Sequence, residues 1–186
     1  MTAPRWRRGR LLVAAPHLDD DPNFRRAVVL VLEHADEGAL GIVLNQPMEV
    51  RAGEALPEPL GQLVPDGAPV FRGGPVQPGT VIVLADFDDA AAAGGITFGS
   101  VGILDPASVE DGPPPAMSRA RAFGGYAGWG GGQLEEEIRQ DAWIDAEPLA
   151  EDVFTDDPAG LWRAVLSRAG GSYRLMATAP DDPMLN

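Results

Sequence analysis

The sequence predicts a single α+β domain in which strands come first and the clearest helices follow. A chain of 186 residues is typical of one domain and can bury a core without disulfides. Continuous apolar runs with β-branched residues predict buried strands, and two segments with apolar residues at helical spacing predict helices. We expect residues 1–186 to form one domain, with residues 1–9 as a flexible, arginine-rich tail.

The expected strands are apolar runs separated by turns that contain glycine. Residues 27–34, "AVVLVLEH", form a continuous apolar run, which predicts a strand buried on both faces. A turn at 35–38 and a second run at 39–47, ended by Pro47, predict a hairpin. Further strands are expected at 79–87, 96–104 and 119–127.

One helix is expected near the end of the chain. Asp157 suits the N-cap and Pro158 the first helical position, where the missing amide hydrogen of proline costs nothing. Gly170 suits the position just after the helix, where a positive φ is common. The apolar stripe of this helix consists of Leu161, Trp162, Val165 and Leu166.

A second helix is expected directly after the glycine-rich stretch "GYAGWGGG", residues 125–132. Gly132 suits its N-cap, and Glu135 at the third helical position can reach back to the N-cap amide. Its inner face consists of Leu134, Ile138 and Ala142.

The glycine-rich stretch itself is expected to be a packing turn and not a phosphate site. It lacks the Lys-Ser or Lys-Thr pair that completes a Walker loop. Glu135–Glu137 occupy the first turn of the following helix, so they would repel the anion that a helix N-terminus otherwise attracts. We therefore expect its glycines, Gly128 included, to allow positive φ and close packing beside Tyr126 and Trp129.

The composition excludes several classes of site and partner. The 28 acidic residues outnumber the 14 arginines, and the resulting net charge of −14 repels nucleic acid and anionic membranes. There is no cysteine and there are only two histidines, so we expect no bound metal and no cofactor. The apolar run at 11–15 is too short for a signal peptide or a membrane span, which predicts a cytoplasmic protein.

Several motifs occur together along the chain in a characteristic order. They are "DPNFRRAVVLVLEHADEGALGIVLNQP", "FRGGPV", "GYAGWGGGQLEEEIRQDAW", "LW" and the terminal "DDPMLN". With this combination the chain resembles the YqgE/AlgH family of bacterial proteins from Leu11 to Asn186. It departs from that family at 105–117, "DPASVEDGPPPAM", where the family commonly has a longer helix.

The resemblance carries expectations about fold and function. It implies an α+β fold with a mixed, largely antiparallel, branched sheet that is partly closed into a small barrel and flanked by helices. The family has no established biochemical activity, so the resemblance implies no catalytic residues. Its members are often labelled transcriptional regulators, and the name AlgH reflects a proposed role in regulating alginate synthesis.

The stretch "RGGP", residues 72–75, is the most distinctive polar candidate. Its glycines expose backbone amides and its arginine could hold an anion, although a tight turn between strands is the simpler interpretation. A ligand pocket could also form where this stretch approaches "GYAGW". The candidate ligand-binding residues are Arg72, Gly73, Gly74, Tyr126 and Trp129.

Other polar residues are expected to be structural. Glu33 and His34 are adjacent on a strand, so they point to opposite faces and cannot act together on one substrate. His17 with Asp19–Asp21 could bind a metal, but Asp21 before a proline better suits the start of a short turn. No serine lies in a nucleophile elbow, so no catalytic set is assigned. The polar candidates are Asp21, Glu33, His34, Asn45, Gln133 and Glu135.

Three functions stay open from the sequence. We favour a binding or regulatory protein that acts through protein partners, because no catalytic constellation is apparent. The second is an enzyme or small-molecule binder with its pocket between "RGGP" and "GYAGW". The third is a DNA-binding regulator, although the acidic charge argues against direct nucleic-acid binding. The identity of the protein partner or small molecule and the oligomeric state stay open.

Overall fold

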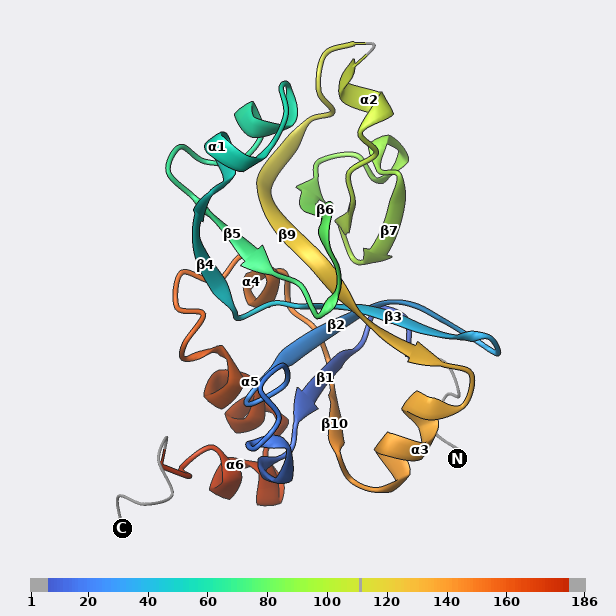
Figure 1. The fold of residues 1–186 in the computed structure, drawn as a ribbon, viewed down its shortest axis with the longest axis vertical. Helices are drawn as coiled ribbons and strands as arrows, with labels where there is room; N and C mark the ends of the chain where they lie inside the picture. Colours follow the sequence, from blue (N-terminus) through green and yellow to red (C-terminus); the bar gives the residue numbers. More distant parts are fainter. Residues whose placement is uncertain (1–6, 111, 181–186) are drawn as a thin grey trace.

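The computed structural model describes residues 7–110 and 112–180, and a ten-stranded sheet flanked by helices dominates it (Figure 1). The strands are β1 (Leu11–Ala14), β2 (Val28–Ala35), β3 (Gly38–Val43), β4 (Pro47–Arg51), β5 (Pro69–Arg72), β6 (Val76–Phe87), β7 (Gly95–Phe98), β8 (Val101–Ile103), β9 (Met117–Gly130) and β10 (Trp143–Ala146). Their order along the sheet is β10–β1–β2–β3–β9–β6–β8–β7, and β5 branches from β9 and pairs with β4. The α+β fold class is thereby confirmed.

The helices are short. They are α1 (Ala52–Ala55), α2 (Ala107–Glu110), α3 (Gln133–Arg139), α4 (Ala150–Val153), α5 (Leu161–Ala169) and α6 (Gly171–Met176), with 3-10 turns η1 (Pro16–Leu18), η2 (Leu60–Gln62) and η3 (Ala90–Ala92). The longest helix of the described residues, α5, has nine residues, which is far below the length that crosses a membrane.

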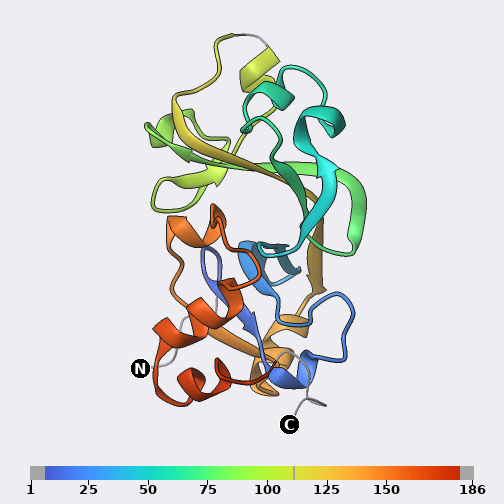
Figure 2. The same ribbon diagram turned by 90° about the vertical axis from the view of Figure 1, so that its left-hand side faces the viewer.

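Strand β9 connects two lobes of the molecule. It pairs with β6 along its first part and with β3 through Ala127–Gly130 at its end. Both views place β4 to β8 with α1 and α2 in one lobe, and β1 to β3, β10 and the remaining helices in the other (Figures 1 and 2). The branch is confirmed, because β9 also pairs in parallel with β5 at Phe123 and Gly124.

The expected partial closure into a small barrel is wrong. The two ends of the sheet path, β10 and β7, do not pair with each other in the described part of the chain. They lie in different lobes (Figure 1), because the long β9 carries β6, β8 and β7 away from β1 and β10. The hydrogen-bond ladder therefore does not return to its first strand.

The core explains why the run at 27–34 is apolar throughout. Alternate residues of β2 face opposite sides of the sheet, so Val28 and Leu30 enter a central cluster while Val29 and Val31 enter a second cluster beneath α3. All four side chains are buried, which confirms the predicted strand with two covered faces. A third cluster fills the lobe around β4 to β8.

Two of the predicted strands end earlier than expected. Strand β3 stops at Val43, and Pro47 begins β4 instead of ending β3. The run 96–104 divides into β7 and β8, which pair with each other, and Gly99 between them has a φ of 51°. The predicted ranges run across both breaks, although polar residues at 45–46 and the pair Gly99–Ser100 mark them in the sequence.

The helix boundaries are partly confirmed. Helix α5 begins at Leu161 and not at Pro158, and Asp157 instead accepts a hydrogen bond from the Gly160 amide (3.0 Å) in the preceding turn. Gly170 ends α5 and Gly132 precedes α3 with φ values of 76° and 77°, as expected. The apolar stripe of α5 is buried in the central cluster, where the Trp162 indole donates to the Ala14 carbonyl.

The expected flexible tail, residues 1–9, lies partly outside the described residues. Residues 7–9 are bonded to the sheet: the Arg7 amide donates to His34 Nδ1 (3.0 Å) and the Gly9 amide to the Val31 carbonyl (2.8 Å). Arg8 donates to the Ile96 carbonyl on β7 (2.9 Å), so this segment connects the two lobes. Within the expected tail, residues 7–9 are therefore bonded to the sheet.

Candidate functional site

The glycine-aromatic stretch forms the end of β9 and packs against α3. Trp129 is 7% exposed and lies near Phe24 and Trp143, with ring centroids 6.4 and 5.9 Å away. Phe24, Trp129 and Trp143, together with the side chains of α3 that contact them, are called the α3 corner below. The packing interpretation of Trp129 agrees with this burial.

The glycine of β9 that adopts a positive φ is Gly125 and not the expected Gly128. Gly128 has an ordinary extended backbone, and a Cβ there would lie 3.6 Å from the Tyr126 ring, which is normal contact. Gly125 has a φ of 72°, and a Cβ there would lie 2.7 Å from the Gly74 carbonyl oxygen. The expectation of a positive φ at Gly128 is therefore wrong, and the requirement falls on Gly125.

Glu137 is the polar centre of the α3 corner, and the sequence did not single it out. Its Oε2 accepts hydrogen bonds from the indole N–H groups of Trp129 and Trp143, both at 2.8 Å. Its Oε1 accepts one from the Gln133 side chain at 2.9 Å. Buried indoles usually find such a partner, and here one carboxylate serves two of them.

His34 and Glu135 are brought together by β2 and α3. The His34 side chain is 1% exposed, and its Nε2 lies 3.2 Å from Glu135 Oε1. Because Nδ1 accepts from the Arg7 amide, we assign the ring proton to Nε2. Glu135 therefore contacts His34 and not the N-cap amide, and the neighbouring Glu33 is exposed.

The "RGGP" stretch meets "GYAGW" backbone to backbone. The Gly73 amide donates to the Gly124 carbonyl (2.8 Å), so it is not available to an anion. A Cβ on Gly73 would collide with the Gly125 carbonyl, and one on Gly74 with Tyr126. This geometry supports the tight-packing interpretation of both glycines.

Arg72 and Asn45 hold the loop that precedes β2. Arg72 Nη2 donates to Asn23 Oδ1 (2.5 Å). Asn45 accepts from the Val28 amide (3.0 Å) and donates to the Arg26 carbonyl (2.9 Å). These bonds make both side chains parts of the fold.

Asp21 has the capping role that its place before a proline predicts. Its Oδ1 accepts from the amides of Asn23 (2.8 Å) and Phe24 (3.2 Å). His17, Asp19 and Asp20 do not gather with it: no three side chains able to bind a metal cluster within the described residues.

A cavity of ligand size lies elsewhere, between the end of β10 and helices α5 and α6. Its volume is about 430 Å³, within the range of ligand pockets. It is lined by Arg10, Asp145, Ala146, Glu147, Leu149, Val165, Arg168, Ala169 and Tyr173. We call it the β10–α6 cavity. None of these residues was a candidate from the sequence.

Two arginines lie at the rim of the β10–α6 cavity. Arg10 donates to Asp145 Oδ1 (2.7 Å) and also pairs with Glu147. Arg168 donates to both carboxylate oxygens of Asp152, at 3.0 and 2.7 Å, and to the Glu147 carbonyl at 3.0 Å. Burial lowers the pKa of Arg10, but its bonds to the two carboxylates outweigh burial and raise the pKa, so it stays charged.

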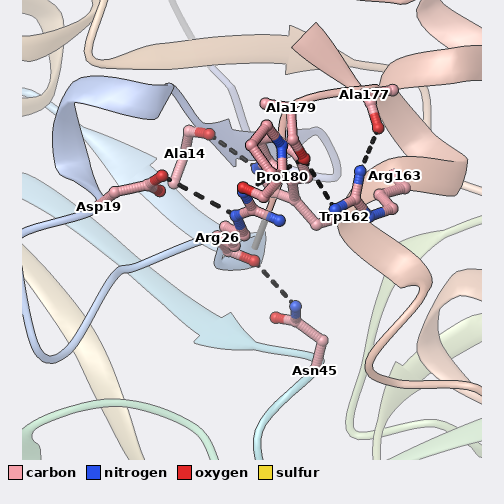
Figure 3. A network of polar contacts seen from close by, with 9 residues as sticks. All are labelled: Ala14, Asp19, Arg26, Asn45, Trp162, Arg163, Ala177, Ala179 and Pro180. Atoms are coloured by element: carbon pink, nitrogen blue, oxygen red, sulfur yellow. Dashed lines mark hydrogen bonds and ion pairs between the residues drawn. The ribbon is translucent and has the colours of Figure 1, made fainter. Parts of the chain in front are cut away.

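The helix that supplies Tyr173 to the cavity is fixed at its far end (Figure 3). Arg163 of α5 donates to the Ala179 carbonyl (2.8 Å), just after α6. Arg26 also donates to that carbonyl (3.4 Å), and its guanidinium lies 4.8 Å from the centre of the Trp162 ring. The wall formed by α6 is therefore anchored to the core.

A second, more open hollow of about 330 Å³ lies over the β2–β3 hairpin beside Trp129. The charged side chains of its described lining are Glu33 and Glu37, both acidic. An acidic, open hollow holds a small molecule less well than the β10–α6 cavity, which combines apolar walls with arginines.

The sequence could have given only a hint of the β10–α6 cavity. Asp145 and Glu147 flank Ala146 at the end of a strand, and this alternation predicts that they share a face. Arg10 and Arg168, which they meet, lie far away in the chain, so only the fold brings these residues together.

The molecule is thus an α+β protein with a ligand-sized cavity whose charged groups are arginines and carboxylates. The chain belongs to the AlgH-like family, which matches residues 11–174. The resemblance found in the motifs is confirmed.

Relatives and solved structures agree with this assignment. A UPF0301 protein of Streptomyces coelicolor is 43% identical over 96% of this chain and 94% of its own, and one of Mycobacteroides abscessus is 36% identical over 99% and 90%. The crystal structure of protein DIP2367 from Corynebacterium diphtheriae has a TM-score of 0.81 at 26% identity, covering 96% of this chain and 95% of that one. The solution structure of the AlgH protein from Pseudomonas aeruginosa has a TM-score of 0.69 at 26% identity, covering 97% of each.

Proposed function

We propose that this protein is a cytoplasmic binding protein with a regulatory and not a catalytic role, and that its ligand site is the β10–α6 cavity. The observation that carries this proposal is the cavity itself: about 430 Å³, with aliphatic walls and a charged rim. The pocket proposed from the sequence, between "RGGP" and "GYAGW", is replaced by this one, because those stretches meet through their backbones.

The chemistry of the cavity favours binding over catalysis. Its lining contains neither histidine nor a serine, threonine or cysteine nucleophile. Its carboxylates, Asp145 and Glu147, form ion pairs with Arg10. Such groups orient and hold a ligand.

A ligand screen with two matched variants tests this proposal. Ala169→Trp fills the cavity, whereas Ala164→Trp places the same indole on an exposed position of α5 outside it. Thermal shifts with cytosolic metabolites should reveal compounds that stabilise wild type and Ala164→Trp but not Ala169→Trp. Hits that stabilise all three proteins equally would contradict the proposed site.

Recovery of partner proteins from the cytosol tests the proposed regulatory role. We expect partner proteins recovered from the cytosol by wild type to be recovered equally by Ala164→Trp, and in altered amount by Ala169→Trp or after addition of a screened ligand. Identical recovery under all conditions would show that partner binding does not depend on the cavity, and it would contradict the proposal that a ligand in the cavity regulates partner binding.

Regulation is proposed to be indirect because DNA contact is disfavoured. If Arg5, Arg7, Arg8 and Arg10 all contacted phosphates, log K would fall with log salt at a slope of about −3.6, at about −0.9 per contact. Arg5 lies outside the described residues, and the other three bond to the protein itself. We expect no sequence-specific binding at about 150 mM salt. Nanomolar binding to one promoter, against competing random DNA, would overturn this.

A further inference from the structure

The two arginines at the rim of the β10–α6 cavity differ in how firmly their partners hold them. Asp152, the partner of Arg168, has a side chain that is only 5% exposed. Glu147, a partner of Arg10, has a side chain that is 81% exposed. An exposed ion pair contributes little to stability, so the contact between Glu147 and Arg10 is easily replaced.

Arg10 also shares its second partner. Asp145 lies 2.7 Å from Arg10 through Oδ1 and 3.0 Å from Arg7 through Oδ2. Both carboxylate oxygens are thereby occupied, and the remaining contact of Arg10 is the exposed Glu147. Nη2 of Arg10 makes no hydrogen bond within the described residues, so the guanidinium has spare donor capacity.

Displacing the Glu147 side chain needs no movement of the backbone. Its carbonyl is held by Arg168 at 3.0 Å, so the loop stays anchored while the carboxylate swings into solvent. A carboxylate from outside can then take the same position on Arg10, and arginine binds carboxylates with good geometry.

The rest of the cavity suits an apolar group. Leu149, Val165 and Ala169 supply aliphatic surface, and the exposed Tyr173 supplies a ring. The Tyr173 hydroxyl makes no hydrogen bond within the described part of the chain, so it remains a possible donor to a ligand. The volume lies at the small end of ligand pockets, which range from about 300 to about 1,000 Å³.

From these observations we infer that the β10–α6 cavity binds a small organic carboxylate with an apolar body, whose carboxylate replaces that of Glu147 on Arg10. The inference rests on the proposed binding function and names its ligand class. It makes Glu147 an internal competitor of the ligand. Removing the Glu147 charge should therefore strengthen binding, an effect that a purely structural ion pair would not give.

The test uses three probes with one skeleton: 3-phenylpropionate, its primary amide and 3-phenylpropylamine. Calorimetric titration of wild type should give a dissociation constant of about 1 mM for the carboxylate. The amide should bind at least about tenfold more weakly, and the amine should not bind, because neither can replace Glu147 on Arg10.

Three variants test whether 3-phenylpropionate binds at Arg10 in the β10–α6 cavity. Glu147→Gln should bind 3-phenylpropionate up to about fivefold more tightly, which corresponds to the loss of one exposed ion pair. Glu151→Gln removes the same charge from an exposed residue outside the cavity and should bind like wild type. Ala169→Trp should not bind.

Each other outcome overturns the inference. If amide and amine bind as well as the carboxylate and Ala169→Trp abolishes all three, the ligand class is wrong while the binding proposal stands. If 3-phenylpropionate binds Ala169→Trp normally, or Glu147→Gln binds no better than wild type, the Arg10 site is wrong. If no probe binds wild type or Glu147→Gln at about 10 mM, the inference fails, and the metabolite screen alone decides the binding proposal.

Discussion

The α3 corner and the β10–α6 cavity show two uses of polar groups beside apolar surface. In the α3 corner, Glu137 accepts hydrogen bonds from two buried indoles and from Gln133. At the cavity, Arg10 pairs with an exposed carboxylate and its aliphatic neighbours line open volume. The first arrangement holds the fold together, and the second leaves room and bonding capacity for a ligand.

The comparison also shows that the most distinctive sequence motifs are not the residues that line the cavity. The conspicuous stretches "GYAGW" and "RGGP" lie where backbones and rings approach most closely. The cavity is built from ordinary residues brought together by the fold. Substitutions should therefore cost stability in the α3 corner and leave it unchanged at the cavity rim.

Trp129→Ala should have the largest effect. Loss of a buried indole should lower the free energy of unfolding by about 3–5 kcal/mol. The substitution leaves a cavity and also removes one hydrogen-bond donor from Glu137. Urea unfolding monitored by circular dichroism measures the change. A variant as stable as wild type would show that the ring is not a packing element, and the glycine-aromatic stretch would then become the candidate binding site.

Gly125→Ala and Gly128→Ala form a matched pair within the same strand. Alanine at Gly125 should cost more than about 1 kcal/mol, because φ is 72° and the Cβ would press on the Gly74 carbonyl. Alanine at Gly128 should change stability much less, since its backbone is extended and the site has room. Equal losses in thermal melts of the two variants would contradict this assignment of strain.

Glu137→Gln should cost about 1–3 kcal/mol, because hydrogen bonds to a charged acceptor are among the stronger ones. Glu136→Gln is the control on the same helix turn. Among the described residues its carboxylate bonds only to Arg139 and Gln140 at the surface, so the melting temperature should stay unchanged. Equal melting temperatures for both variants would remove Glu137 from its central role.

The smallest effect on stability is expected at the cavity. Glu147→Gln should alter the free energy of unfolding by less than about 0.5 kcal/mol, as is usual for exposed positions. A large loss would mean that the Arg10–Glu147 contact is structural, and the contrast between the two regions would not hold.

The strands and the inner face of α5 could be predicted because their signals are local. The apolar run of β2 and the stripe from Leu161 to Leu166 record burial directly in the order of residues. The branch and the open sheet could not be derived that way, since they depend on which strands the long β9 meets. The barrel expected from the family resemblance failed for the same reason.

The candidate site could be predicted from the sequence less well than the fold. Arg72 is predicted to hold a ligand but donates to Asn23, whereas Asp21 and Asn45, which are expected to be structural, bond to the backbone. Arg10 gives no signal in the sequence, and the alternation of Asp145 and Glu147 gives only a hint, because a cavity depends on the space left between elements. A sequence pattern indicates which residues are buried, but it does not indicate where the fold leaves a cavity.

The central claim is that ligand binding belongs to the β10–α6 cavity and not to the α3 corner. Two-dimensional amide NMR of the wild-type protein during titration with 3-phenylpropionate tests it in one measurement, because backbone and indole N–H signals report both regions together. We expect shifts in residues 145–149 and 165–173, while the indole signals of Trp129 and Trp143, bonded to Glu137, stay in place. Shifts confined to those two indoles and to residues 125–137 would contradict the claim and assign ligand binding to the glycine-aromatic stretch.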